Sequence, residues 1–238
     1  HVWGNACNFE KLIKICKEKN ILIIEDAAES LGTRYTSGDF KGNHTGTIGD
    51  FGCISFNGNK IITAGVGGVV LTASENSFKK VDYLSKQAKD DSFNYVHNEM
   101  GFNYRLSNIN AALGLAQAEN LKAILVKKNE IHNLYKKHFK ENEKFKVMDT
   151  PDYARNNNWL NILKVLNGNK DWALKKLNES GIEARPIWKL CHEQKYLKHF
   201  EVTEITNAIE QVNSCICLPS SVDLNEEDIK FISGVINE

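Results

Sequence analysis

Apolar residues recur at helical spacing near the start of the chain and then give way to a short continuous apolar run. The apolar positions between residues 9 and 19 are Phe9, Leu12, Ile13, Ile15 and Cys16. This spacing predicts a helix, with Asn8 as its N-cap. The run ILII at residues 21–24 has no polar alternation. It therefore predicts a buried strand of a parallel sheet.

A second strand is predicted at residues 51–56, where the chain reads FGCISF, and it leads to Lys60. Gly65, Gly67 and Gly68 follow and surround Val66, and another short apolar strand is predicted at residues 69–71. Because glycine has no Cβ, these positions allow the backbone to pack close beside a bound group or to take a positive φ.

The second half of the chain predicts one long helix and then a smaller α/β unit. The helix runs from residue 106 to about residue 138, and small residues dominate its first part. The elements predicted after residue 140 are a strand at 159–165, a helix at 172–179 that stops at Gly181, a strand at 184–188 and a helix at 225–235. We therefore expect two domains, residues 1–125 and residues 126–238, packed on each other.

The composition is that of an ordinary globular protein, with 42% hydrophobic and 25% charged residues. Thirty basic residues balance thirty acidic ones, which removes the usual reason to expect nucleic acid or an anionic membrane as a partner. No apolar run approaches the about 18 residues of a membrane span, and no leader pattern opens the sequence. A cytoplasmic location is the resulting expectation.

The six cysteines show no spacing typical of a zinc or disulfide oxidoreductase site. Cys215 and Cys217 lie on one face of a predicted strand, but no histidine or acid accompanies them, so packing is favoured over a metal site. We expect reduced, mainly structural thiols and no bound metal.

Three residues near the first two strands have the chemistry that pyridoxal phosphate requires. Lys60 has an amine that can form a Schiff base with the cofactor aldehyde. Asp26 follows the first predicted strand, and a carboxylate there favours the protonated pyridine nitrogen. Ser55 offers a hydroxyl to the phosphate, in a stretch rich in small residues. Asp26 sits where open α/β sheets bind their ligands, at the carboxyl end of a strand.

Each of these assignments has a plain structural alternative. Taken alone, Lys60 reads as a solvated surface lysine, Asp26 as a helix N-cap and Ser55 as a strand hydroxyl bonded to backbone. An acid such as Glu29 in the first turn of a helix already gains from the helix dipole. Arg185 suits a diphosphate or an ordinary salt bridge equally well.

Five ordered motifs resemble the DegT/DnrJ/EryC1/StrS family of sugar aminotransferases. The motifs are HVWGN at residues 1–5, EDAAE at 25–29, GTIGD at 46–50, SFNGNK at 55–60 and GFNYRLS at 101–107. The resemblance extends from His1 almost to the C-terminus. It implies an α/β architecture, the fold type I of pyridoxal phosphate enzymes, with a large domain of mainly parallel sheet and a smaller C-terminal α/β domain.

The resemblance also implies roles for seven residues. Lys60 would form the Schiff base and Asp26 would pair with the pyridine nitrogen. Glu29 would lie near the ring, and Ser55 and Asn57 would bind the cofactor from the SFNGNK motif. Asn103 would reach the phosphate of a neighbouring subunit, with Arg105 as a companion, which implies a homodimer with shared active sites.

The implied reaction is transfer of an amino group from L-glutamate to a nucleotide-linked 4-keto-6-deoxy sugar, for surface glycan biosynthesis. Two departures from the family pattern stand out. The chain opens at a motif that relatives place well inside the large domain, so we expect an N-terminal portion with several strands to be missing. Valine occupies position 66, where relatives have glycine or glutamate. A truncated, non-catalytic dimerisation or binding module is therefore the alternative hypothesis.

Overall fold

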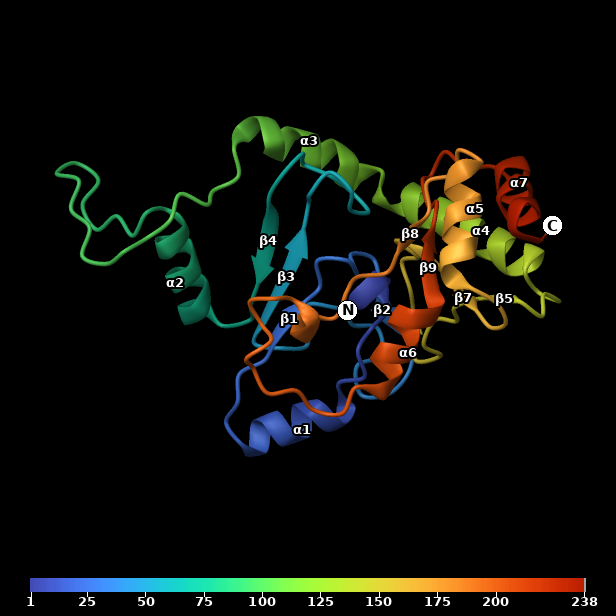
Figure 1. Cartoon of the computed structure of the whole chain (residues 1–238). Helices are drawn as coiled ribbons and strands as arrows, with labels where there is room; N and C mark the ends of the chain where they lie inside the picture. Colours follow the sequence, from blue (N-terminus) through green and yellow to red (C-terminus); the bar gives the residue numbers. More distant parts are fainter. Residues whose placement is uncertain (238) are drawn as a thin grey trace. The chain divides into compact units, whose positions relative to one another are not determined.

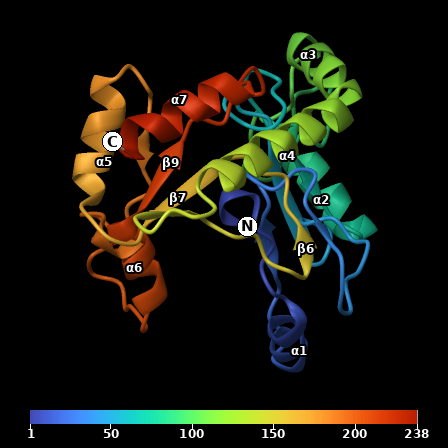
Figure 2. The same ribbon diagram turned by 90° about the vertical axis from the view of Figure 1, so that its right-hand side faces the viewer.

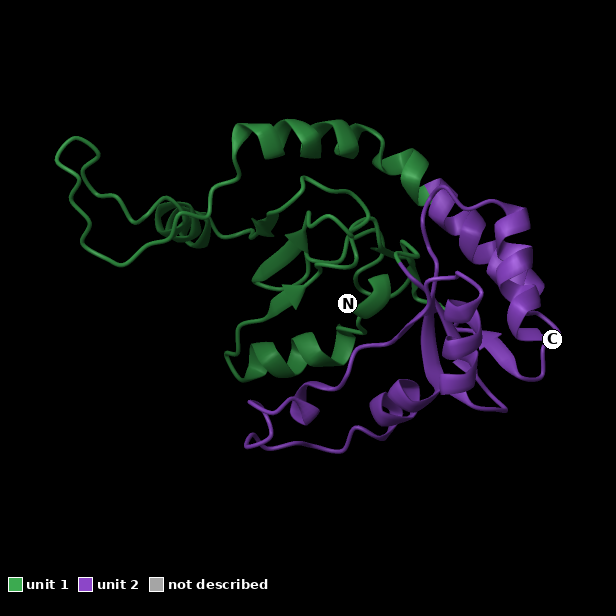
Figure 3. Cartoon of the chain, turned by 45° about the horizontal axis from the view of Figure 1, so that its top comes forward, with its two compact units in different colours: residues 1–125, 150–159 green, residues 126–149, 160–238 purple. Residues whose placement is uncertain are grey.

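The computed structural model describes residues 1–237, which form two units. The first unit contains residues 1–125 and 150–159, and the second contains residues 126–149 and the chain from residue 160 onward (Figure 3). The segment 150–159 thus returns to the first unit after the chain has entered the second. Each unit has its own sheet and its own buried residues.

The sheet of the first unit has three strands in the order β1-β3-β4 (Figure 1). The strands are β1 (Ile24–Asp26), β3 (Phe51–Ser55) and β4 (Gly68–Leu71). β1 and β3 are parallel, with Asp26 opposite Cys53, whereas β3 and β4 are antiparallel. The carboxyl ends of β1 and β3 therefore point the same way, toward one end of the sheet. The sheet thus contains one parallel and one antiparallel pair.

The apolar run at residues 21–24 is far more exposed than its sequence predicts, and only its last residue belongs to the strand. Ile21 is 56% exposed, Leu22 is 71% exposed and Ile24 is 68% exposed. Among residues 1–237, β1 pairs only with β3 and is therefore an edge strand, and residues 21–23 precede it. The prediction of a buried strand is therefore wrong for this chain.

The α-helices of the first unit differ in how they begin: two are capped by a serine hydroxyl, whereas the helix that begins at Glu10 has Phe9, and not the predicted Asn8, as its N-cap. Those helices are α1 (Glu10–Glu18), α2 (Glu75–Ser85) and α3 (Asn108–Glu119), and a 3-10 helix spans Val2–Gly4. The hydroxyl of Ser74 accepts the N–H of Ser77 at 3.2 Å, and that of Ser107 accepts the N–H of Asn110 at 3.3 Å. These bonds satisfy N–H groups that have no partner within the helix. The segment between α2 and α3 extends from the sheet as an arm (Figure 1).

The single long helix predicted from residue 106 is two helices, α3 and α4 (Leu121–His138). Asn120 separates them, and its side-chain Nδ2 donates to the carbonyl of Ala116 at 2.8 Å. Asparagine competes in this way with the backbone hydrogen bonds of a helix, so a break is favoured at this position.

A short antiparallel pair, β2 (Arg34–Tyr35) with β6 (Ala154–Arg155), ties the segment 150–159 into the first unit. Tyr35 and Ala154 are buried there beside Ala6 and Phe9. The Tyr153 hydroxyl donates to the carbonyl of Ala6 at 2.9 Å. This segment is therefore held by both backbone pairing and a small apolar cluster.

The second unit has a four-stranded antiparallel sheet in the order β5-β7-β9-β8. Its strands are β5 (Phe145–Val147), β7 (Asn161–Val165), β8 (Arg185–Pro186) and β9 (Cys215–Leu218), and its further helices are α5 (Lys170–Glu179), α6 (Thr206–Ser214) and α7 (Glu226–Asn237), with a 3-10 helix at Cys191–Glu193. α5 and α7 lie side by side (Figure 2). Residues of the sheet and of α4, α5 and α7 form one continuous core.

Within residues 1–237, no helix is long and apolar enough to cross a membrane. The same residues contain no group of three His, Cys, Asp or Glu side chains suited to hold a metal ion. All six cysteines are free thiols.

Candidate active site

Two candidate residues end neighbouring parallel strands. Asp26 is the last residue of β1 and Ser55 is the last residue of β3. Because β1 and β3 are parallel, both side chains belong to the carboxyl edge of the sheet, where open α/β sheets bind ligands. The Oδ1 atom of Asp26 also accepts the N–H of Ala28 at 3.1 Å. This bond fixes the carboxylate relative to the turn that follows. Residues 27–33 form turns and no helix, so the readings of Asp26 as a helix N-cap and of Glu29 as an acid in the first turn of a helix are wrong.

The loop after β3 folds back on itself and carries Lys60. The Ser55 hydroxyl accepts the N–H of Asn57 at 3.2 Å, and the carbonyl of Asn57 accepts the N–H of Lys60 at 3.1 Å. Gly65 and Gly67 close the loop with φ values of +82° and +100°. The positive φ expected of these glycines is therefore confirmed, and residues with a Cβ would be strained there.

The amine of Lys60 lies between a carboxylate and an aromatic ring. Its Nζ atom is 3.7 Å from Oε1 of Glu29 and 4.2 Å from the ring centroid of Trp159. The side chain of Lys60 is only 15% exposed. The reading of Lys60 as a solvated surface lysine is thereby excluded.

Glu29 is held on its other side by the backbone, since its Oε2 accepts the N–H of Trp3 at 2.7 Å. Burial raises the pKa of the Glu29 carboxyl above its usual value; the Trp3 N–H and Lys60 oppose this shift, and the negative charge of Asp26 adds to it. The charges of Lys60 and Asp26 thus both act on the Glu29 carboxyl, in opposite directions.

Trp159 is a member of this site that the sequence did not reveal. Its indole Nε1 donates to the carbonyl of Asn59 at 2.7 Å, so the ring is fixed to the loop that carries Lys60. Sequence reasoning assigned Trp159 to a strand, but the strand starts at Asn161. The two partners are separated by about one hundred positions, and no local pattern reports such a contact.

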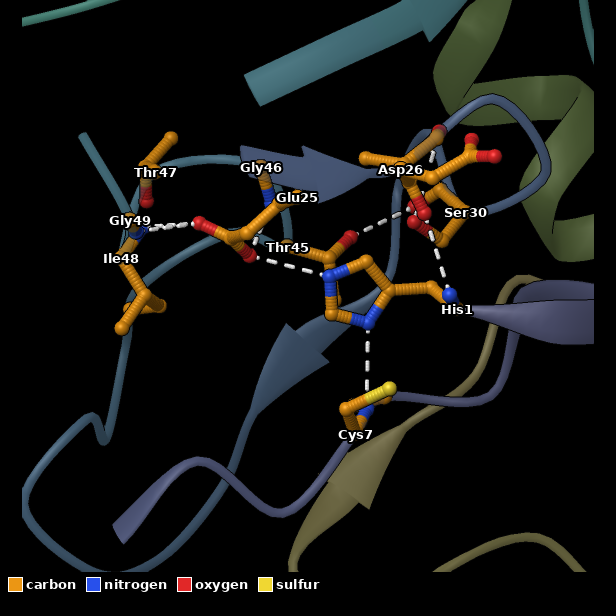
Figure 4. A network of polar contacts seen from close by, with 12 residues as sticks. His1, Cys7, Glu25, Asp26, Ser30, Thr45, Gly46, Thr47, Ile48 and Gly49 are labelled. Atoms are coloured by element: carbon orange, nitrogen blue, oxygen red, sulfur yellow. Dashed lines mark hydrogen bonds and ion pairs between the residues drawn. The ribbon is translucent and has the colours of Figure 1, made fainter. Parts of the chain in front are cut away.

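Glu25 and Asp26 are adjacent in β1, yet their carboxylates point in different directions (Figure 4). This follows from the alternation of side chains along a strand. The Glu25 carboxylate accepts the N–H groups of Gly46, Ile48 and Gly49 at 2.5 to 2.8 Å, and it lies 2.9 Å from Nε2 of His1. Glu25 therefore holds the GTIGD motif against β1.

The pair of His1 and Glu25 is almost completely buried. Burial acts to lower the pKa of His1, but the side chains of Cys7 and Glu25 raise it to about 9. Burial likewise acts to raise the pKa of Glu25, but His1 and the three N–H groups hold it below its usual value. Both shifts favour the charged forms, so the pair stabilises the loop behind Asp26.

The other candidate residues have partners of their own. Asn103 forms a bridge with Lys86 at the base of the arm. Arg105 pairs with Asp82 at 3.1 Å. In the second unit Arg185 pairs with Glu183, which satisfies the salt-bridge reading of that arginine. The present chain therefore brings together Lys60, Glu29, Asp26, Ser55 and Asn57.

A family model for the DegT/DnrJ/EryC1/StrS aminotransferase family matches residues 1–237. The chain belongs to this family. The resemblance drawn from its motifs is thus confirmed. EpsN of Bacillus subtilis (strain 168) is 37% identical over 235 residues, which cover 96% of this chain. GDP-perosamine synthase of Escherichia coli O157:H7 is 32% identical over 244 aligned residues, which cover the whole chain.

The fold is shared with solved members of the family. A DegT/DnrJ/EryC1/StrS aminotransferase from Brucella abortus has a TM-score of 0.88 at 24% identity and matches 99% of this chain. PseC of Helicobacter pylori has a TM-score of 0.87 at 23% identity. The fold type I α/β architecture is therefore established. The match covers 59% of EpsN, 64% of the synthase and 62% of the Brucella chain, so this chain spans about three fifths of its relatives.

Proposed function

We propose that this chain carries the reactive lysine of a pyridoxal phosphate-dependent aminotransferase that acts on a nucleotide-linked sugar. The observation that carries the proposal is the Lys60 amine, which is largely buried and lies 3.7 Å from Glu29. Asp26 and Ser55 end the two parallel strands beside it. This set of an amine, a carboxylate and a hydroxyl suits the aldehyde, the ring nitrogen and the phosphate of that cofactor.

Each residue has a definite task in this proposal. Pyridoxal phosphate, when bound, supplies a ring that withdraws electrons from the α-carbon of the amino donor. Lys60 Nζ would hold the cofactor through its aldehyde. Once the amino donor has freed this amine, it would move a proton at the α-carbon of the donor. The Asp26 carboxylate keeps a proton on the ring nitrogen. Ser55 Oγ and Asn57 bind the phosphate end, and Glu29 orients Lys60.

We further propose L-glutamate as the amino donor and a 4-keto-6-deoxy sugar as the acceptor, with the product destined for a surface glycan. The names of two relatives support this choice, because one is a GDP-perosamine synthase and another is a UDP-4-amino-4,6-dideoxy-N-acetyl-beta-L-altrosamine transaminase. Both names describe amino sugars linked to a nucleotide. The six free thiols are in keeping with a cytoplasmic location.

A homodimer with shared sites is also part of the proposal. Phe93 is 88% exposed, Tyr95 is 74% exposed and Met100 is 82% exposed, and all three belong to the arm between α2 and α3. Large apolar side chains gathered on one exposed segment are typical of an interaction surface. Asn103, at the base of this arm, would then serve the site of the second subunit.

The test is to locate the lysine that captures the cofactor. The 238-residue chain is incubated with pyridoxal phosphate, reduced with borohydride and analysed by mass spectrometry of its peptides. We expect the label on Lys60, no label at that peptide in Lys60→Ala, and unchanged labelling in the control Lys19→Ala, which alters an exposed lysine. Equal labelling of many exposed lysines would contradict the proposal and favour the non-catalytic module.

A further inference from the structure

The Lys60 amine is flanked by Glu29 and Trp159, and Trp159 has no role in the reaction described above. The ring of Trp159 lies on one side at 4.2 Å and the Glu29 carboxylate on another at 3.7 Å. Trp159 is 3% exposed, so its ring is fixed in the interior. An aromatic face together with a carboxylate is the combination that binds an ammonium group, by cation–π attraction and by charge.

A single buried asparagine bonds to the backbone of both Trp159 and Glu29. Asn157 is 2% exposed, and its Oδ1 accepts the N–H of Trp159 at 2.9 Å. Its Nδ2 donates to the carbonyl of Glu29 at 2.8 Å. The indole N–H of Trp159 is fixed in turn by the carbonyl of Asn59. The Glu29 carboxylate also accepts the N–H of Trp3 at 2.7 Å, so the ring and the carboxylate each have a hydrogen-bond partner other than the lysine amine.

We propose that Trp159 and Glu29 form a seat for a primary ammonium group, which Lys60 fills in this structure and which the ammonium of the amino donor takes when the lysine amine is engaged elsewhere. The seat rests on the proposed function for its second occupant. Its chemistry needs only a small cation with N–H donors, because the ring attracts the charge and the carboxylate accepts a hydrogen bond.

The test is to empty the seat and refill it from solution. Lys60→Ala removes three methylene groups and the amine, which together correspond to n-propylammonium. We expect n-propylammonium chloride, added at constant ionic strength, to shift the Trp159 indole N–H resonance of Lys60→Ala in a saturable way. The wild-type chain should show no such shift, because Lys60 already occupies the seat.

Matched controls separate the seat from general cation binding. The neutral isostere n-propanol should leave the resonance unchanged. In the Lys60→Ala background, Trp159→Leu should weaken binding, followed at neighbouring amide resonances, by about 2-fold to about 30-fold, the range expected for loss of a cation–π contact. Trp172→Leu, which alters an aromatic residue of the second unit, should not change it.

Three outcomes would overturn the seat: no saturable shift in Lys60→Ala, equal binding of n-propanol, or equal binding by the wild-type chain. If Trp159→Leu unfolds the chain and its spectrum loses dispersion, Glu29→Gln replaces it as the test in the Lys60→Ala background. Glu29→Gln keeps the Trp159 indole resonance, and it must also weaken the binding of n-propylammonium. None of these measurements contains the cofactor. Propylammonium binding without cofactor capture at Lys60 would therefore refute the proposed function and leave the seat intact, and the reverse result would refute only the seat.

Discussion

The two units of this chain differ in how completely they bury their own sheets. In the second unit, β7 and β9 lie within a continuous core, and Leu163 and Ile216 are fully buried. In the first unit, Ile24 of β1 is 68% exposed and Val70 of β4 is 45% exposed. The edge strands of the sheet that carries the candidate active site thus expose apolar side chains, whereas the central strands of the other sheet are covered.

This difference shows that the site does not derive its order from a large apolar core. It depends instead on polar contacts between distant segments, such as Glu25 with the GTIGD motif and Asn157 with Glu29. Buried polar groups with satisfied partners specify one arrangement because leaving any of them unpaired costs free energy. Open edges with apolar residues also invite pairing with another segment.

The strongest test of this comparison removes one apolar side chain from each sheet. Leu163→Ala should lower the free energy of unfolding by about 2 to 5 kcal/mol, because it leaves a cavity in the core of the second unit. Ile24→Ala should change it by no more than about 0.5 kcal/mol, because the side chain already faces water. Denaturant unfolding followed by fluorescence and circular dichroism gives both values. Equal losses would mean that the edge at β1 is covered in solution.

Two glycines offer a second matched pair, one in each unit. A Cβ at Gly52 of β3 would lie 1.9 Å from the carbonyl oxygen of Gly46, so Gly52→Ala forces the GTIGD motif away from the sheet. We expect a loss of about 1 to 3 kcal/mol, as for other overpacked sites. A Cβ at Gly234 of α7 meets no atom within 4 Å. Gly234→Ala should stabilise the chain by about 0.5 to 1 kcal/mol, since alanine favours a helix.

Hydrogen exchange by mass spectrometry locates these two effects. Gly52→Ala should speed exchange in peptides that cover β1 and β3, and it should leave β7 and β9 unchanged. A uniform change across both sheets would show that the units unfold together. The two substitutions would then report on one common free energy of unfolding, and not on the stability of each unit.

Local patterns predicted the elements that depend on neighbouring residues. The periodic spacing of apolar residues located α1, α5 and α7, and the apolar strand after the GTIGD motif located β3 and the loop that carries Lys60. The break at Asn120 was missed, because small residues continue the helical pattern across it. The exposure of residues 21–24 was also missed, since an apolar run does not report which strands flank it.

The site was predicted only as far as its motifs extend. Lys60 and Glu29, which the resemblance assigns to the cofactor, lie 3.7 Å apart, and Ser55 bonds to Asn57 within one motif. Trp159 and Asn157 come from a segment that returns to the first unit late in the chain. Their contacts depend on topology rather than on local spacing, so sequence periodicity carries no information about them.

A third expected effect, smaller than the main losses predicted for Leu163→Ala and Gly52→Ala, concerns the pH dependence of the pair formed by His1 and Glu25. The pKa of His1 is raised from 6.5 to about 9, so its contribution to stability is complete below pH 6.5 and is lost as the pH rises through about 9. The lowered pKa of Glu25 adds stability above its usual value of 4.5, which is lost as the pH falls through the lowered pKa.

The Nδ1 atom of His1 accepts the N–H of Cys7, and a proton at Nδ1 would cost that hydrogen bond. We therefore expect a loss of only about 1 kcal/mol between pH 6.5 and pH 9, the size of one net hydrogen bond. The measurement is the difference in unfolding free energy between the wild-type chain and Glu25→Gln across this range, and a difference that grows with pH would contradict the charged pair.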